Sequence, residues 1–178
     1  MAATKAVVCF GDSNTWGYDP RDKFGEHYPD RWTDLLAGLT AWDVQNQGVN
    51  GREVPDAPGL LEPQTDLFLV MLGTNDLLQL DTPEAAAQRM EVFLSSMDPK
   101  RVVILAPPPM VFGEWVQDQE LIDDSLRLGV LYEALAARLG VRFINTGAWN
   151  VPLCFDGVHF TQEGQRIFAE NLAKELMV

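Results

Sequence analysis

The sequence predicts an α/β fold, a three-layer α/β/α sandwich around a five-stranded parallel sheet, in one domain over residues 1–178. Short apolar runs, which are typical of buried strands, alternate with longer segments whose apolar residues follow helical spacing. This alternation predicts parallel strands joined by right-handed helical crossovers. We expect a flavodoxin-like strand order, 2-1-3-4-5.

The first strand is predicted at Ala6–Phe10, a short apolar and partly β-branched run. It stops at Gly11–Asn14 (Gly-Asp-Ser-Asn), where small, turn-prone residues end the strand. Ser13 is therefore expected outside the carboxyl end of a buried strand, where open α/β sheets bind ligands. Because Gly-Asp-Ser also occurs in ordinary turns, this interpretation depends on the rest of the chain.

A helix and a second strand follow. Pro29 and Asp30 open the helix, with Asp30 as its N-cap. Alternation predicts the strand at Trp42–Asn46. The segment Glu53–Gln64 contains three prolines and has room for at most one helical turn, near Gly59–Glu62.

The middle of the chain carries the strongest strand pattern, Leu67–Leu72, which ends at the polar cluster Gly73–Asp76. Thr82 is expected to cap the next helix and Pro83 to start it, because proline lacks the N–H that is unpaired at a helix start. A fourth strand is predicted at Arg101–Leu105.

The last third predicts a long helix at Gln119–Leu139, ended by Gly140 at the usual C-terminal glycine position. A fifth strand is expected at Val141–Ile144. An irregular loop then leads to a final helix that Thr161 caps.

Composition restricts the classes of partner. The chain has 26 acidic and 13 basic residues and a net charge of −13, which argues against nucleic acids and anionic membranes. Cys9 and Cys154 lack metal-type spacing and are expected to be reduced. No apolar run reaches transmembrane length, and residues 1–5 lack the apolar core of a signal peptide. We therefore expect a cytoplasmic protein.

In the predicted strand order, Ser13, the Gly48–Gly51 loop, Asn75 and the segment Asp156–His159 meet at the carboxyl edge of the sheet. A serine hydroxyl becomes a nucleophile when a base takes its proton and a third group orients that base. His159 follows Asp156 by three residues, so Asp156 can hold Nδ1 while Nε2 faces Ser13. The alternative is a surface histidine beside a turn-forming aspartate.

Acyl transfer also needs donors directed at the developing oxyanion. The candidates are the backbone N–H groups of Ser13 and Gly51 and the side-chain amide of Asn75. A local turn or cap is the alternative role for Asn75.

Together, four segments in this order resemble the SGNH hydrolases, also called the GDSL esterase/lipase family. They are Gly11–Asn14, Asn46–Gly51, Gly73–Asp76 and Asp156–His159, and they span nearly the whole chain. The resemblance implies that Ser13 is the nucleophile, His159 the base and Asp156 its orienting residue. It also implies an oxyanion hole formed by Ser13, Gly51 and Asn75.

The first motif is most similar to small-ester arylesterases and acyltransferases, with two departures. Asn14 stands where the family usually has leucine, and we expect this change to alter a packing contact more than the chemistry. The segment after Gly51 is also shorter than in related esterases, which leaves one wall of the site low or missing.

Six further residues are candidates for lining the substrate site: Asp12, Trp16, Met110, Phe112, Trp115 and Trp149. For the aromatic residues the alternative is local core packing, and for Asp12 it is a hydrogen bond within its own turn. The other histidine, His27, is expected to be structural or exposed.

The sequence thus predicts a carboxylic-ester hydrolase that acts on short-acyl, acetyl-like esters through an acyl-serine intermediate, without a cofactor or metal. A thioesterase, a carbohydrate deacetylase and an acyltransferase remain alternatives with the same chemistry. A non-catalytic flavodoxin-like binding module is an alternative of a different class. The expected partner is a small-molecule ester, and a homo-oligomer stays open.

Overall fold

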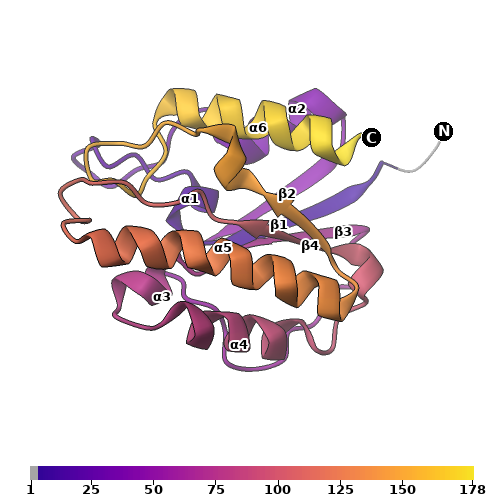
Figure 1. The fold of residues 1–178 in the computed structure, drawn as a ribbon. Helices are drawn as coiled ribbons and strands as arrows, with labels where there is room; N and C mark the ends of the chain where they lie inside the picture. Colours follow the sequence, from indigo (N-terminus) through magenta and orange to yellow (C-terminus); the bar gives the residue numbers. More distant parts are fainter. Residues whose placement is uncertain (1–3) are drawn as a thin grey trace.

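The computed structural model describes residues 4–178 and contains one five-stranded parallel sheet in the order β2-β1-β3-β4-β5 (Figure 1). The fold class and the strand order predicted from the sequence are confirmed. Residues 1–3, which are part of the segment used in the signal-peptide expectation, lie outside the described residues. The strands are β1 Ala6–Gly11, β2 Asp43–Gly48, β3 Leu67–Met71, β4 Val102–Ala106 and β5 Arg142–Asn145.

Helices cover both faces of the sheet. Helices α2 and α6 pack together over one face, while α4 and α5 pack over the other, with α3 beside them (Figure 1). The helices are α1 Ser13–Trp16, α2 Trp32–Thr40, α3 Thr74–Leu78, α4 Pro83–Leu94, α5 Gln119–Leu139 and α6 Gln162–Leu176, and two 3₁₀ helices are η1 Pro99–Arg101 and η2 Thr146–Trp149. Within residues 4–178, no helix has both the length and the apolarity needed to cross a bilayer.

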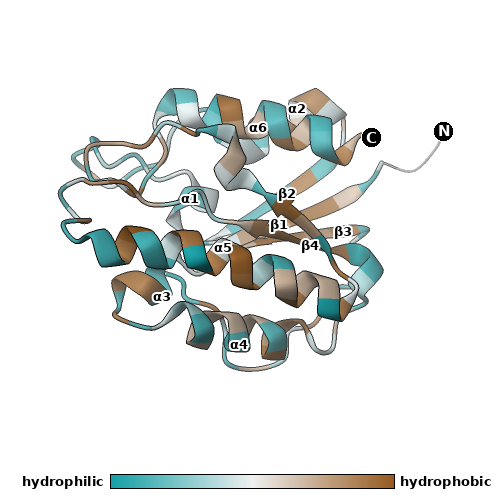
Figure 2. Cartoon of the chain, viewed as in Figure 1, coloured by the Kyte–Doolittle hydropathy of each residue, from teal (hydrophilic) through white to brown (hydrophobic). Residues whose placement is uncertain are grey.

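Successive residues of the central strands enter two separate cores. In β1, Val7 and Cys9 belong to the core under α2 and α6, whereas Val8 belongs to the core under α4 and α5. β3 is buried at every position, as expected for a parallel strand that is covered on both faces. Figure 2 shows the central strands mostly in brown and the helices alternating between brown and teal, so the apolar residues gather between the layers.

Several helix boundaries match the sequence predictions. The Thr82 side chain accepts a hydrogen bond from the Ala85 N–H, and Pro83 opens α4. α5 spans the predicted range and ends at Gly140, which has a φ of +67°. The Thr161 side chain caps α6 by accepting from the Gly164 N–H. Local capping chemistry was sufficient to predict these ends.

Two local predictions are wrong. α2 begins at Trp32 with Arg31 at its N-cap, because the Asp34 carboxylate accepts from both the backbone and the guanidinium of Arg31. Residues 59–62 are not helical. The Gly59 N–H donates to the Phe93 carbonyl at 2.8 Å, so tertiary contact with α4 sets the path of this segment.

Two short helices that the sequence does not predict, α1 and α3, start directly after buried strands. Their first residues belong to the polar clusters at Gly11–Asn14 and Gly73–Asp76, for which the sequence predicts only the end of a strand. Each cluster therefore ends a strand and begins a helix.

Two glycines, one inside α5 and one directly after its last residue, allow a test of this helix. Gly129 lies in the helix interior, and a methyl group there would be 3.7 Å from the Ala106 side chain, which is ordinary contact. We expect Gly129→Ala to raise the free energy of unfolding by about 0.5–1 kcal/mol in urea denaturation. Gly140→Ala should lower it by about 1 kcal/mol, because alanine is strained at positive φ. Destabilisation by Gly129→Ala would contradict this account of the helix.

Candidate active site

Ser13 lies at the junction between β1 and α1. Asp12 caps α1 by accepting the Asn14 N–H at 2.9 Å. The turn needs a glycine at position 11, because a Cβ atom there would lie 2.0 Å from Thr15 Oγ1 and 2.9 Å from the Met71 carbonyl oxygen. Glycine at position 11 therefore allows the end of β1 to lie close to both α1 and β3, and this packing places Ser13 directly beyond the end of the strand.

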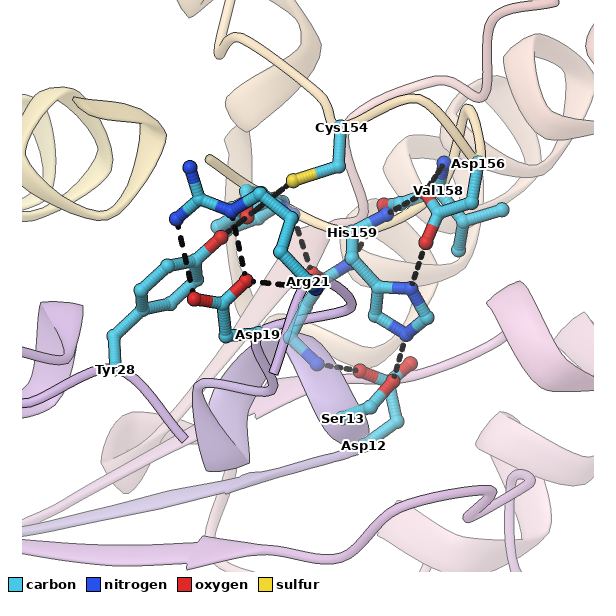
Figure 3. A network of polar contacts seen from close by, with 11 residues as sticks. Asp12, Ser13, Asp19, Arg21, Tyr28, Cys154, Asp156, Val158 and His159 are labelled. Atoms are coloured by element: carbon cyan, nitrogen blue, oxygen red, sulfur yellow. Dashed lines mark hydrogen bonds and ion pairs between the residues drawn. The ribbon is translucent and has the colours of Figure 1, made fainter. Parts of the chain in front are cut away.

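A continuous chain of hydrogen bonds links Ser13, His159 and Asp156 (Figure 3). Ser13 Oγ is 2.9 Å from His159 Nε2, and His159 Nδ1 is 2.7 Å from Asp156 Oδ2. With the imidazole proton on Nδ1 donated to the carboxylate, Nε2 is free to accept the serine proton. All three side chains are buried, so little water competes for these bonds.

The other oxygen of Asp156 is also satisfied. Oδ1 accepts the backbone N–H groups of Val158 at 2.9 Å and His159 at 3.0 Å. Burial raises the pKa of Asp156, but hydrogen bonds from the His159 side chain and from these N–H groups outweigh it and hold that pKa below its ordinary value. A carboxylate that stays ionised can both orient a neutral imidazole and stabilise an imidazolium.

Two aromatic rings pack against His159. The Tyr18 ring centroid is 4.8 Å from the imidazole centroid, and the Trp115 centroid is 5.2 Å from it, both in edge-to-face geometry. The Trp115 N–H of the backbone donates to the Asp156 carbonyl at 3.1 Å, which ties the two loops together. The rings restrict the imidazole and limit its contact with water.

A second polar network supports the histidine loop from another side (Figure 3). The Tyr28 hydroxyl donates to the Phe160 carbonyl at 3.0 Å and lies 3.5 Å from Cys154 Sγ. Arg21 pairs with Asp19 beside this tyrosine. The loop that carries His159 is thus bonded to the loop that follows α1.

Ser13, Gly51, Asn75 and His159 line one cavity of about 320 Å³. Gly51 has a φ of +76°, a conformation that favours glycine. Asn75 Nδ2 donates one hydrogen bond to the Arg52 carbonyl at 3.1 Å. Because an amide nitrogen carries two N–H groups, this bond orients the side chain and leaves one donor for a ligand.

Two charged residues hold the loop that contains Gly51. Arg52 Nη1 donates to the Gly11 carbonyl at 3.0 Å, and its guanidinium stacks 4.0 Å from the Phe10 ring centroid. The carboxylate of Asp76, which is completely buried, accepts the Val54 N–H and pairs with Arg89. The loop is therefore attached to β1 on one side and to α3 on the other.

The structure brings together Ser13, Asp156 and His159, with Gly51 and Asn75 beside them, as the sequence analysis predicted. Of the six residues that were candidates for lining the site, only Trp115 lines this cavity within residues 4–178.

The other five candidates lie elsewhere. Asp12 caps α1, and the Trp16 ring packs against His27. Met110 is buried in the core beside α5, and Trp149 packs against Phe168 of α6. Phe112 is 63% exposed and does not line the cavity.

Sequence reasoning missed Tyr18 and Asn50, which also line the cavity. Asn50 precedes Gly51 in the Asn46–Gly51 motif, and this position could have indicated that Asn50 lines the site. Tyr18 follows Gly17, whose φ of +89° ends α1 and turns the chain back toward His159. This reversal depends on α1, which the sequence analysis did not predict.

Comparison with known proteins finds one matching family and several structures with the same fold. Residues 9–167 match the model of the GDSL-like lipase/acylhydrolase family. An M. smegmatis aryl esterase structure is similar, with 26% identity, a TM-score of 0.82 and coverage of 98% of this chain and 99% of that chain. A carbohydrate acetylesterase from Sinorhizobium meliloti has 25% identity, a TM-score of 0.81 and the same coverage, 98% and 99%. No match is found among curated proteins.

The buried carboxyl group of Asp12 gives a prediction for pH dependence. Burial raises the pKa of Asp12 to about 6, against about 3.9 for an unfolded aspartate. The folded state therefore binds the Asp12 proton more tightly than the unfolded state does. As a result, the contribution of Asp12 to the free energy of unfolding falls as the pH rises between these two pKa values. Asp12→Asn keeps an oxygen for the Asn14 N–H but does not ionise.

The stability of Asp12→Asn relative to wild type should consequently increase between about pH 4 and pH 6. Urea denaturation of both proteins at several pH values measures this difference. A difference in free energy of unfolding that stays constant with pH would contradict the raised pKa of Asp12.

Proposed function

The chain belongs to the GDSL-like lipase/acylhydrolase family and is a serine ester hydrolase, and we propose that it hydrolyses esters of short, acetyl-like acyl groups through an acyl-serine intermediate on Ser13. The observation that carries this proposal is the hydrogen-bonded chain from Asp156 through His159 to Ser13 at the wall of one cavity. Gly51 and Asn75 border the same cavity and supply further donors.

In the first half of the proposed reaction, Ser13 Oγ attacks the ester carbonyl carbon while His159 Nε2 takes the hydroxyl proton. The carbonyl oxygen becomes an oxyanion, which accepts hydrogen bonds from the N–H groups of Ser13 and Gly51 and from Asn75 Nδ2. The imidazolium that forms stays paired with the Asp156 carboxylate. It then returns its proton to the alkoxide, so the alcohol leaves and the acyl group remains on Ser13.

The second half repeats the chemistry with water. His159 Nε2 removes a proton from a water molecule, which attacks the acyl carbon and forms a second oxyanion in the same hole. Collapse of this intermediate breaks the bond to Ser13 Oγ, and His159 returns the proton to the serine. The carboxylic acid leaves, and the starting protonation state is restored.

A short acyl group is favoured by the size of the site. The cavity of about 320 Å³ is near the lower limit of about 300 Å³ for small-molecule sites. None of residues 52–66 lines it. That segment instead bonds to α3 through the Val54 N–H and to α4 through the Gly59 N–H, so it contributes no wall above Ser13.

Carbohydrate deacetylation, thioester hydrolysis and acyl transfer to alcohols would use the same residues. The names of the M. smegmatis and S. meliloti neighbours, an aryl esterase and a carbohydrate acetylesterase, support acetyl-like esters as the first substrates to test. A cytoplasmic location remains part of the proposal and is supported by two unpaired cysteines.

The two histidines of the chain distinguish a catalytic from a structural role. His159→Ala removes the proposed base and should lower kcat for p-nitrophenyl acetate by about 100- to 10,000-fold. His27→Ala is the matched control, because His27 Nδ1 bonds to the carbonyl of its neighbour Tyr28 at 2.7 Å and the ring does not line the cavity. Similar losses in both folded variants would contradict the assignment of His159.

The proposed oxyanion hole predicts a defect in kcat when its side-chain donor is removed. Asn75→Ala should lower kcat by about 100- to 1,000-fold, because one donor to the oxyanion is lost. Steady-state kinetics measures this loss, and a variant with normal kcat and only a raised KM would place Asn75 in ground-state binding instead.

Substrate size gives a third prediction. Because the cavity is small, kcat/KM should fall steeply from acetyl to octanoyl p-nitrophenyl esters. Because residues 52–66 form no wall above Ser13, kcat/KM should change little between acetates of small and bulky phenols of matched acidity. A preference for octanoyl over acetyl esters would contradict the proposed short-acyl site.

A further inference from the structure

Asn14, the residue after Ser13, makes two hydrogen bonds to the loop that carries His159. Its Nδ2 donates to the Val158 carbonyl at 3.0 Å, and its Oδ1 accepts the Phe160 N–H at 3.0 Å. Val158 and Phe160 are the neighbours of His159 on either side. One buried amide side chain therefore holds the backbone on both sides of the histidine.

The backbone of Asn14 is itself fixed. Its N–H donates to Asp12 Oδ1 at 2.9 Å, and its carbonyl accepts the indole N–H of Trp32 at 3.0 Å. Trp32 is buried against α6, so this anchor belongs to the core. The Asn14 amide thus joins a rigid point beside Ser13 to the backbone that carries His159.

From this geometry we propose that Asn14 is a positioning residue that sets the approach of His159 Nε2 to Ser13 Oγ. The inference rests on the proposed function of that pair. It corrects the expectation that Asn14, in place of the leucine usual in the family, changes mainly a packing contact. An aliphatic side chain has neither the donor nor the acceptor that this bridge uses.

The bridge matters for chemistry because proton transfer needs the base within hydrogen-bonding distance of the hydroxyl. Asp156 fixes the rotation and tautomer of the imidazole, but both residues belong to the same loop. The hydrogen bonds of Asn14 instead connect that loop to the start of α1, where Ser13 lies. A misplacement of about 1 Å can cost about 100-fold in rate.

Asn14→Leu is the informative variant, because leucine nearly matches asparagine in size and is the residue usual in the family. We expect kcat for p-nitrophenyl acetate to fall about 10- to 100-fold, with little change in KM. Asn14→Ala removes the same two bonds with a smaller side chain and serves as a second variant if leucine prevents folding.

Met90→Ala is the control for general destabilisation, because Met90 is buried in α4 under the opposite face of the sheet. All proteins are assayed well below their unfolding temperatures. Proton NMR of the hydrogen between His159 Nδ1 and Asp156 adds a readout of the site itself, and its signal should shift or broaden in the Asn14 variants and stay unchanged in Met90→Ala.

A selective loss of kcat in the Asn14 variants supports the inference. Wild-type kcat in both folded Asn14 variants, or an equal loss in Met90→Ala, would overturn it. A wild-type protein that does not hydrolyse p-nitrophenyl acetate or any other short-acyl ester would refute the proposed function, and the inference with it. An active wild type with unaffected Asn14 variants would refute the inference alone.

Discussion

The hydrogen bond between His159 Nδ1 and Asp156 Oδ2 is the interaction on which the site depends. With its proton on Nδ1, the imidazole donates to this carboxylate and leaves Nε2 to face Ser13, and in the proposed acyl transfer the charged carboxylate would balance the imidazolium. The carboxylate is held by the backbone N–H groups of Val158 and His159, and its pKa stays low despite burial. Tyr18 and Trp115 then confine the imidazole ring.

Sheet topology brings the rest of the site to this pair. β1 is paired with both β2 and β3, so the segments after these three strands meet at one edge: Ser13 after β1, Gly51 after β2 and Asn75 after β3. Close packing restricts the residues that fit there. A Cβ atom at Gly48 would lie 2.1 Å from the Trp16 backbone nitrogen, so β2 and α1 can approach only with glycine at this position.

The fold and the grouping of Ser13, Asp156 and His159 could be predicted from the sequence, because strand ends and the motifs that follow them are recognised from local patterns. Buried strands, capped helices and polar residues at strand ends can be recognised without tertiary information, as at Pro83 and Ser13. The start of α2 was misplaced because of a local contact between Arg31 and Asp34, but other errors arose where tertiary contacts decide the structure. Gly59 follows the surface of α4, Trp149 packs on α6, and the hydrogen bonds of Asn14 join residues 144 and 146 positions apart in the chain.

The most direct test of the central claim is covalent labelling of the folded protein with a fluorophosphonate, followed by peptide mapping by mass spectrometry. Such a probe reacts with a serine whose proton a neighbouring base removes. The account predicts one modified site, Ser13, with Ser125 unlabelled because it lies in α5 and bonds to the Ile122 carbonyl. Absence of labelling in the folded wild type, or labelling of another serine that persists in Ser13→Ala, would contradict it.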